Sequence, residues 1–450
     1  MILETVNRFV WGAPALLLIL GTGLWLTVRT GFAQFRLFPD ALRQFFSSFR
    51  PREVSAGVSP FRALCTALAA TVGTGNMVGV AGAIALGGPG AIFWMWICAL
   101  AGMVTKFAEA TLAVRFRVEE GGEWVGGPMY MIRQRMGKRW QWLGLLYSFF
   151  GVVAAFGVGN ATQINAVIAG INEMLAAFGG TQSRGRDLLL GAVLAMLVGS
   201  MLLGGAACIG SAAEKLVPFA SAVYILLCAG VLIARYPAVP GALAAILTGA
   251  FSPRAVTGGV VGSAFQALRV GVSRGVFTNE AGLGTASIAH ASAQVSHPVK
   301  QGLMGIMEVF LDTVVICTLT ALVILCSGVP VPYGTDAGGY LTGAAFRSVY
   351  GPWVTVLLAG CLCCFAFATV LGWGLYGARC AQFLFGPGAW KVFALVQTIT
   401  VLLSALLETS VIWSVAETVN GLMAIPNLII LAALSPELRR LTMEYKKFYG

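Results

Sequence analysis

The strongest constraint on the fold of this chain is its apolar segments of about 20 residues, which recur along almost its whole length. Eleven such segments can be read at 9–28, 62–86, 91–114, 142–172, 187–207, 216–234, 256–290, 302–328, 352–377, 390–407 and 411–434. Lipid offers no hydrogen bonds to an open backbone, so segments of this length cross a bilayer as helices. Only 10% of the residues are charged, against about 25% in soluble domains. The sequence therefore predicts an all-α integral membrane protein with about eleven transmembrane helices.

Basic residues are distributed unevenly between the two sides of these segments. With the C-terminus placed inside, 22 Lys and Arg lie on the inner side and six on the outer side, and Lys106 lies within a segment. Loops rich in Lys and Arg remain in the cytoplasm. Because eleven crossings put the termini on opposite sides, we expect the N-terminus outside and the C-terminus in the cytoplasm. The net charge of +11 belongs to these loops, so we expect no nucleic-acid partner.

The remaining segments predict how the chain is divided. The first span is too long for the core of a signal peptide, so we expect it to remain as a helix. Residues 35–49 place Phe and Leu opposite polar side chains, which predicts an amphipathic helix on the membrane surface. We expect an N-terminal helix with this connector, two halves and a cytoplasmic tail, with boundaries at 1–60, 61–235, 236–434 and 435–450.

Two of the predicted spans are interrupted at polar and glycine-rich positions. The second contains Gly73-Thr74-Gly75-Asn76, and the seventh contains the sequence from Thr278 to Gly284. Glycines and a buried amide make a poor continuous helix, and a helix that unwinds halfway across a bilayer exposes backbone carbonyls that can hold a cation. The N-terminus of the second half-helix can hold an anionic group such as a carboxylate. We therefore expect a binding site at the second span.

The positions of these breaks indicate an inverted repeat. Spans two to six and spans seven to eleven can be laid over one another as two halves of five helices each, with the two broken spans in corresponding places. The first half starts inside and the second starts outside. Paired broken helices in two inverted halves point to a site near the middle of the membrane, at the interface between the halves.

Several uncharged polar residues within the spans are candidates for that site. Asn76 follows the first break, and an amide in hydrocarbon needs a partner. Gln163 lies on the fourth span, where packing against a neighbouring helix and contact with a substrate are equal alternatives. Thr369 and Trp373 are four residues apart on the ninth span and share one face. A threonine hydroxyl can bind a hard cation such as Na+, and a tryptophan can form the wall of a small pocket.

Ionisable residues within the spans are functional candidates by default. We expect Lys106 and Glu109, three residues apart, to neutralise each other. Glu308 and Asp312 carry like charges on one face, so we expect one of them to be protonated or to meet Arg269 or Arg274. With Glu280 in the seventh span, these two carboxylates are candidates for gating or coupling. His290 and His297 have no Cys or carboxylate at ligand spacing, so we expect them at a surface or interface and not in a metal site.

Several motifs together resemble the alanine or glycine:cation symporter family. They are Gly73-Thr74-Gly75-Asn76, Gly87 to Trp96, Gly102 to Glu109, Gly126-Gly127-Pro128-Met129-Tyr130, Thr278 to Gly284 with Ile288 to Ala291, His297 to Gly302, Glu308 to Thr313 and Leu371-Gly372-Trp373. The resemblance covers nearly the whole chain. It implies a leucine-transporter-type fold with two inverted five-helix repeats and one extra N-terminal helix.

The resemblance also implies a function and a site. Members are symporters of the bacterial inner membrane that take up alanine or glycine with Na+ or, in some members, H+. The residues expected to contact the substrate are Thr74, Gly75, Asn76, Gln163, Thr369 and Trp373. By analogy with the fold, the Na+ ligands would be the carbonyls of Ala69 and Val72 with the hydroxyl of Thr369. Membrane lipids are the other partner implied, and no obligate protein partner is evident.

Three other functions were weighed against a symporter. A channel needs a continuous polar stripe, whereas the polar residues here gather in the middle of the spans. An intramembrane enzyme could use Glu308, Asp312 or Glu280 as acid or base, but the sequence offers no nucleophile or metal set to accompany them, so we do not expect an enzyme. An amino-acid exchanger of the same fold is not separated from a symporter by the sequence.

Overall fold

The computed structural model describes residues 12–49, 58–335, 338–406 and 410–449. The start of the first predicted span, at residues 9–11, lies outside these ranges. The helices of the first part are α2 (Ala13–Thr30), α3 (Ala33–Arg36), α4 (Phe38–Ser47), α5 (Pro60–Thr71), η1 (Gly75–Gly79), α6 (Val80–Gly87), α7 (Gly90–Arg115), α8 (Pro128–Arg135), η2 (Lys138–Trp140), α9 (Gln141–Phe156), η3 (Gly157–Ala161), α10 (Thr162–Ala177), α11 (Arg184–Leu203) and α12 (Gly205–Ala234). Those of the second part are η4 (Tyr236–Ala238), α13 (Val239–Phe251), α14 (Pro253–Thr257), α15 (Ala264–Asn279), α16 (Thr285–His290), α17 (Pro298–Val309), η5 (Phe310–Cys317), α18 (Thr318–Cys326), α19 (Gly338–Tyr350), α20 (Val354–Phe385), α21 (Ala389–Ser404), α22 (Ser410–Ala433) and α23 (Ser435–Tyr449).

Each of the eleven predicted spans corresponds to a helix or to a pair of helices in the described part of the chain. They are α2, α5 with α6, α7, α9 with α10, α11, α12, α15 with α16, α17 with α18, α20, α21 and α22. Large apolar side chains cover the outer surface, such as Leu226 and Ile233 of α12, which are 71% and 73% exposed. A soluble protein would bury such side chains, so this surface faces lipid. The all-α membrane fold is confirmed.

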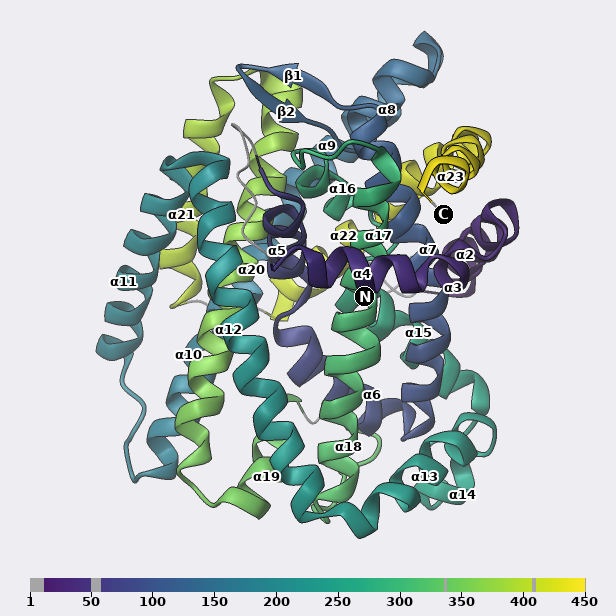
Figure 1. The fold of residues 1–450 in the computed structure, drawn as a ribbon. Coiled ribbons are helices and arrows are strands. Elements are labelled where there is room, and N and C mark those ends of the chain that lie inside the picture. Colours follow the sequence, from purple (N-terminus) through teal and green to yellow (C-terminus); the bar gives the residue numbers. More distant parts are fainter. Residues whose placement is uncertain (1–11, 50–57, 336–337, 407–409, 450) are drawn as a thin grey trace.

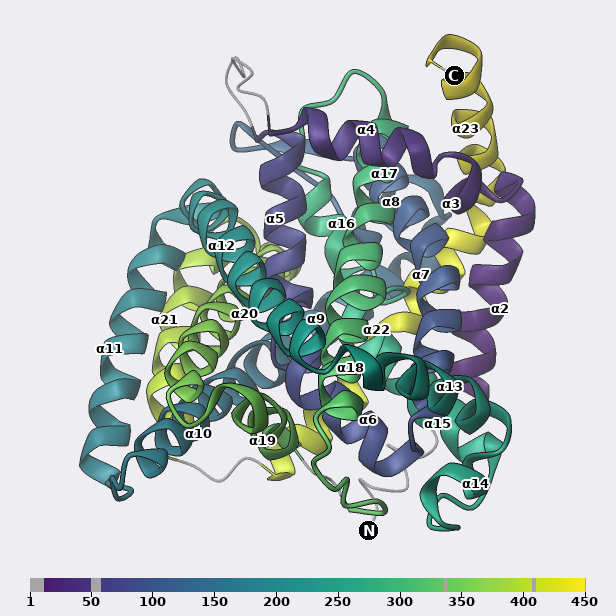
Figure 2. The same cartoon turned by 60° about the horizontal axis from the view of Figure 1, so that its bottom comes forward.

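The structure also contains helices in places where the sequence analysis expected connections. Apolar α13 and the short α14 follow the sixth span, so the seventh begins at Ala264 and not at residue 256. α19 precedes α20. The predicted amphipathic helix is split into α3 and α4, and α4 lies across the ends of the spans (Figure 2). A two-stranded antiparallel hairpin, β1 (Val118–Glu120) and β2 (Glu123–Val125), lies at the top of the molecule in Figure 1, near α8.

The two broken spans run in opposite directions. In Figure 1 the chain descends from α5 to α6 and ascends from α15 to α16. The halves of the first broken span are bent by 51°. This antiparallel arrangement is the one expected of two inverted repeats.

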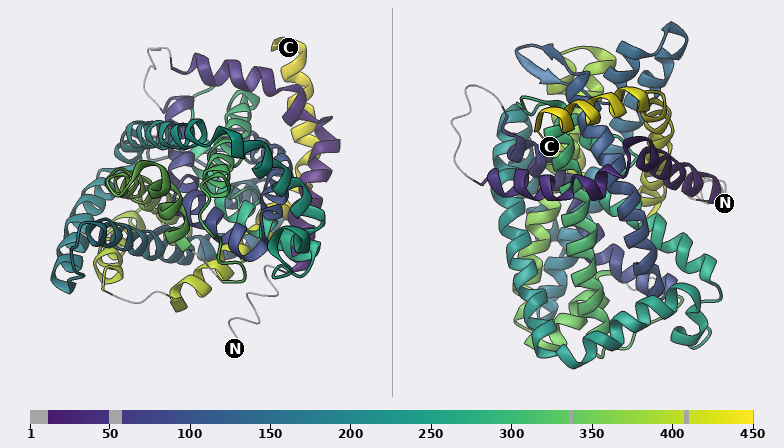
Figure 3. Two further views of the ribbon diagram at one scale, coloured as in Figure 1. Left: turned by 90° about the horizontal axis from the view of Figure 1, so that it is seen from below. Right: turned by 45° about the vertical axis from the view of Figure 1, so that its right-hand side comes forward.

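α7 packs against α15 and α17 with almost no space between the backbones. A Cβ atom added to Gly271 of α15 would lie 2.3 Å from the carbonyl oxygen of Ala91, and one added to Gly305 of α17 would lie 2.7 Å from that of Lys106. Real Cβ atoms do not approach carbonyl oxygens so closely, so these positions accept only glycine. Small residues let membrane helices approach in this way. α7, α15 and α17 are therefore packed tightly against one another, within the bundle that Figure 3 shows from below and from its right-hand side.

Candidate functional site

The first broken span unwinds where the sequence predicts. α5 ends at Thr71, and the chain continues into the π-helix η1 at Gly75. The N–H of Gly73 donates to the Oδ1 atom of Asn76 at 2.9 Å, and the N–H of Asn76 donates to the carbonyl of Gly73 at 3.3 Å. The Asn76 side chain thus satisfies the backbone of the break, which explains why an amide lies buried in a membrane-spanning helix.

These two hydrogen bonds free two backbone carbonyls. In a continuous α-helix the carbonyls of Ala69 and Val72 would accept from the N–H groups of Gly73 and Asn76. Those N–H groups donate elsewhere, so both carbonyls lose their helical donors. The hydroxyl of Thr369 on α20 lies against the same break, 2.8 Å from the position that a Cβ on Gly73 would take. Carbonyl and hydroxyl oxygens of this kind can bind a hard cation.

The other side of the break faces α10 and α15. The hydroxyl of Thr74 donates to the Oε1 atom of Gln163 at 3.3 Å. The amide nitrogen of Gln163 donates to the carbonyl of Val158 at 3.1 Å, so this side chain is held in place by its own helix. A Cβ added to Gly75 would lie 3.3 Å from the hydroxyl of Thr278. The break is therefore enclosed by polar groups from several helices.

Trp373 closes this region from α20. Its indole is fully buried, and its Nε1–H donates to the Oε1 atom of Glu280 at 2.9 Å. The Oε2 atom of Glu280 accepts from the hydroxyl of Thr285 at 2.6 Å. A Cβ added to Gly159 of η3 would lie 2.2 Å from the Cβ of Trp373, so the tryptophan fits only against a glycine. The indole is thus fixed on both sides.

The second broken span is held open by Glu109 of α7. Glu280 takes a left-handed backbone conformation with φ of 53° directly after α15, and Gly282 and Gly284 follow with φ of 94° and 80°. The Oε1 atom of Glu109 accepts from the N–H groups of Gly282 and Gly284 at 3.0 and 3.1 Å, and from the Asn427 amide at 2.8 Å. Glu109 therefore supports the unwound backbone. The expected pair between Lys106 and Glu109 is wrong, because residues three apart on a helix can each find a partner on another helix.

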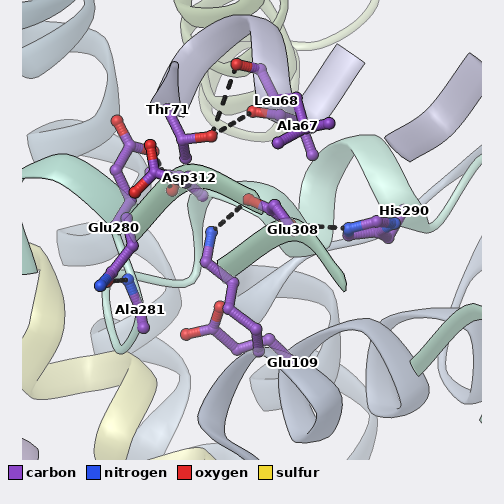
Figure 4. Close-up of polar contacts among 12 residues, drawn as sticks. Ala67, Leu68, Thr71, Glu109, Glu280, Ala281, His290, Glu308 and Asp312 are labelled. Carbon is purple, nitrogen blue, oxygen red and sulfur yellow. Dashed lines mark hydrogen bonds and ion pairs between the residues drawn. The ribbon is translucent and has the colours of Figure 1, made fainter. Parts of the chain in front are cut away.

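Lys106 forms its ion pair with Glu308 of α17. The Nζ atom of Lys106 lies 2.8 Å from the Oε1 atom of Glu308, and the Nε2 atom of His290 lies 3.0 Å from Oε2. All three side chains are fully buried. Figure 4 shows Glu308 facing His290, with Glu109, Glu280 and Asp312 around them. One expectation is therefore wrong, because His290 is not at a surface. The cation that Glu308 meets is Lys106 of α7 and not Arg269 or Arg274, and the alternative that one of Glu308 and Asp312 is protonated stays a prediction.

Asp312 of η5 connects the two breaks. Its Oδ1 atom accepts from the amide nitrogen of Asn76 at 2.7 Å, and its Oδ2 atom accepts from the hydroxyl of Thr313 at 2.7 Å. The hydroxyl of Thr313 accepts from the amide nitrogen of Asn279 at 3.1 Å. A chain of hydrogen bonds therefore runs from the first break to the end of α15.

The buried charges in this region are not balanced. Four carboxylates, on Glu109, Glu280, Glu308 and Asp312, are at most 2% exposed, whereas Lys106 is the one fully buried lysine or arginine among the described residues. Buried charge is costly unless it is paired. In the described part of the chain no three His, Cys, Asp or Glu side chains converge on a metal site. A cation here would therefore rely on carbonyl and hydroxyl oxygens, with the surrounding carboxylates contributing to the electrostatic field.

A cavity of about 340 Å³ leads towards the first break from one end of the molecule. Its walls come from η1, α10, α19 and α20, and they include Met77, next to Asn76. The hydroxyl of Thr342 on α19 donates to the carbonyl of Met77 at 2.8 Å. At the rim, Arg347 of α19 forms an ion pair with Glu173 of α10 at 2.6 Å. α19, which the sequence analysis did not predict, thus covers one side of the candidate site.

Comparison with known proteins identifies the family of this chain. Residues 1–449 match the Sodium:alanine symporter family. The chain belongs to this family. It is 42% identical over 442 residues to the sodium/alanine symporter AgcS of Methanococcus maripaludis, a match that covers 96% of this chain and 94% of AgcS. It is 37% identical over 441 residues to the probable sodium/glutamine symporter GlnT of Bacillus subtilis, covering 96% and 88%.

The fold of this Sodium:alanine symporter family member also has relatives among solved structures. The crystal structure of MhsT in complex with L-phenylalanine superposes with a TM-score of 0.60 at 14% identity, covering 87% of this chain and 99% of MhsT. This likeness confirms the leucine-transporter-type fold. The chain is therefore a multi-pass membrane protein of a family of cation-coupled amino-acid symporters, and it is not an enzyme.

Proposed function

We propose that this protein imports a small neutral amino acid, alanine or glycine, together with Na+ by alternating access. The observation that carries the proposal is the first break, where the carbonyls of Ala69 and Val72 lose their helical donors beside the hydroxyl of Thr369. These three oxygens are the proposed Na+ ligands.

The substrate is assigned to the polar groups next to this cation. Its carboxylate would meet the chain at Thr74, Gly75 and Asn76, where a half-helix begins and its dipole favours an anion. Gln163, Thr369 and Trp373 would enclose the rest of the molecule. Because Gly159 and Glu280 fix Trp373, the indole would exclude large side chains and admit a methyl group or hydrogen. GlnT bears the name of a glutamine symporter, so glutamine is the informative competitor.

Coupling would follow from the arrangement of the two breaks. Bound Na+ would lower the free-energy cost of leaving the carbonyls of the break without hydrogen bonds. The break would then be ordered for the amino-acid carboxylate, so ion and substrate would bind cooperatively. The hydrogen bonds from Asn76 through Asp312 and Thr313 to Asn279 would carry this change to the second break. Glu280 lies in that break and Glu308 of α17 contacts His290 at the end of α16; these two carboxylates are the other proposed coupling residues.

The orientation is also a proposal. With the N-terminus outside and the C-terminus in the cytoplasm of a bacterial inner membrane, the cavity bounded by α19 faces the outside. Substrate would enter past the ion pair of Arg347 and Glu173. Residues 61–235 and 236–434 would then be the two inverted halves.

H+ coupling is the second candidate, and the excess of buried carboxylates over Lys106 favours it. Asp312 contacts Asn76 directly, so its protonation would change the first break. The third candidate function is the exchange of one amino acid for another across the membrane by a protein of the same fold.

Uptake of radiolabelled alanine into proteoliposomes separates these functions. We expect concentrative uptake driven by an inward Na+ gradient, absent with K+, and competed by glycine but not by glutamine. Uptake that follows a pH gradient would replace Na+ with H+, and uptake that requires amino acid inside the vesicle would indicate exchange.

Variants then test the site. Asn76→Ala and Thr369→Ala should abolish uptake while the protein is still produced and folded. Thr400→Ala is the matched control, because its hydroxyl donates to the carbonyl four residues earlier as that of Thr369 does, but from an exposed position on α21. Near-normal uptake by both site variants would refute the assignment.

A further inference from the structure

A basic pocket of about 360 Å³ lies far from the substrate site, where the end of α2 meets α3 and α23. Figure 2 shows α23 beside this end of α2. Four of its nine lining residues are basic and none is acidic; the basic residues are Arg29, Arg36, Arg439 and Lys446. We call this site the basic pocket. Like charges gathered around one cavity repel one another unless an anion lies between them.

The carboxylates of α23 do not neutralise the basic pocket. Glu437 and Glu444 both form ion pairs with Arg440. Arg439 and Lys446 lie on a different face of the helix, with the pocket, and neither makes an ion pair with any residue that the structure describes. The helix therefore separates its paired charges from two free cations.

The turn after α2 brings the other two cations to the same place. Gly31 ends α2 with φ of 64°, a left-handed conformation that favours glycine, and the Nη1 atom of Arg36 lies 2.9 Å from the position that a Cβ there would take, so this guanidinium folds back over the helix end. The Nε atom of Arg29 is buried without a hydrogen-bond partner among the described residues. A cation in the last turn of α2 compensates the helix dipole, which accounts for Arg29 and not for the three cations from α3 and α23.

Apolar surface adjoins the basic pocket. Leu24 of α2 is 65% exposed, Trp25 is 49% exposed, and Met443, which lines the pocket, is 61% exposed. The pocket thus lies where a lipid-facing helix ends and charged side chains begin. Cationic pockets at this depth, on the side that we propose to be cytoplasmic, suit the head groups of anionic lipids. We propose that the basic pocket holds the phosphate of an anionic phospholipid whose acyl chains lie along α2.

Native mass spectrometry of the purified, delipidated full chain tests this proposal. The probes are phosphatidylglycerol and phosphatidylcholine with identical acyl chains. We expect the wild type to bind one phosphatidylglycerol much more tightly than phosphatidylcholine, and R36Q/K446Q to bind it about thirtyfold more weakly, because two surface cations are lost. The matched control K138Q/R139Q removes two exposed cations from η2, outside the pocket, and should bind like the wild type.

The outcomes are distinct. Equal affinity of R36Q/K446Q and the wild type for phosphatidylglycerol would overturn the proposal. The second outcome concerns free phosphate. If excess inorganic phosphate removes the bound lipid completely, and the protein shows no preference between the two lipids, the occupant is a free phosphate ion and the proposal of a lipid is overturned. Size-exclusion chromatography and Na+-driven alanine uptake show whether R36Q/K446Q is folded. If this variant is not folded, Arg439→Gln, on the exposed face of α23, tests the same pocket.

Discussion

The ion pair of Lys106 and Glu308 gives a quantitative test of how the buried charges are held. Both side chains are fully buried, and their charged atoms are 2.8 Å apart. With an effective dielectric constant of 20, their attraction is about 6 kcal/mol, which offsets the cost of removing two charges from water. Lys106→Met removes the cation but keeps the length of the side chain. Glu308 is then buried without its cation, so we expect the free energy of unfolding to fall by about 3–5 kcal/mol.

A double-mutant cycle separates the pair from its surroundings. Glu308→Gln alone should also destabilise, because Lys106 loses its nearest carboxylate, whereas the amide introduced by this substitution still reaches His290. The double variant K106M/E308Q contains neither charge, and we expect it to lie within about 2 kcal/mol of the wild type. The assay is equilibrium unfolding in dodecylmaltoside micelles titrated with SDS. Additive losses in the double variant, or single variants within about 1 kcal/mol of the wild type, would refute the reasoning.

Two further predictions concern Trp373 and α23. Gly159→Ala places a Cβ 2.2 Å from that of Trp373, so we expect the free energy of unfolding to fall by about 1–3 kcal/mol and alanine uptake to fall clearly. The control is Gly360→Ala, whose Cβ would meet nothing within 4 Å. It should leave both stability and uptake unchanged. Hydrogen bonding to Arg440 lowers the pKa of Glu437 from 4.5 to about 2. The ionised carboxylate therefore stabilises the docked α23 above pH 4.5. This stabilisation is lost as the pH falls from 4.5 through 2. The measurement is the protection factor of the α23 amides in deuterium exchange, that is, the exchange rate corrected for its intrinsic dependence on pH. Protection factors that fall below pH 4.5 in the wild type but not in Glu437→Gln would show this, and protection factors that do not change with pH in either protein would contradict it.

The spans and breaks could be predicted because the bilayer imposes them locally. A helix needs a fixed number of apolar residues to cross, and glycine with asparagine in the middle of such a helix has few uses other than a break. The break at Gly73 and Asn76 was therefore visible in the sequence. α13 could not be predicted in this way. It is an apolar helix of only 13 residues, and a segment of that length has the same hydropathy pattern as a loop that touches the membrane.

The partners of the buried charges could not be predicted for a different reason. Lys106 is three residues from Glu109, and that spacing suggested a pair. Its actual partner, Glu308, is 202 residues away, and Glu109 accepts from the backbone of Gly282 and Gly284 instead. Spacing along a helix shows which side chains share a face, but only the packing of α7 on α17 decides which of them meet. His290 was misplaced for the same reason.

The close backbone contacts of α7 limit how the protein can change shape. Because a Cβ at Gly271 would lie 2.3 Å from the carbonyl of Ala91, a rotation of α15 about its axis by one residue, about 100°, would bring Val270 or Val272 into space that admits only hydrogen. The same holds for α17 at Gly305. These three helices must therefore keep their mutual distances while access alternates between the two sides. In the transport cycle that we propose, we expect bending between α15 and α16 to fall on the unwound residues 280–284.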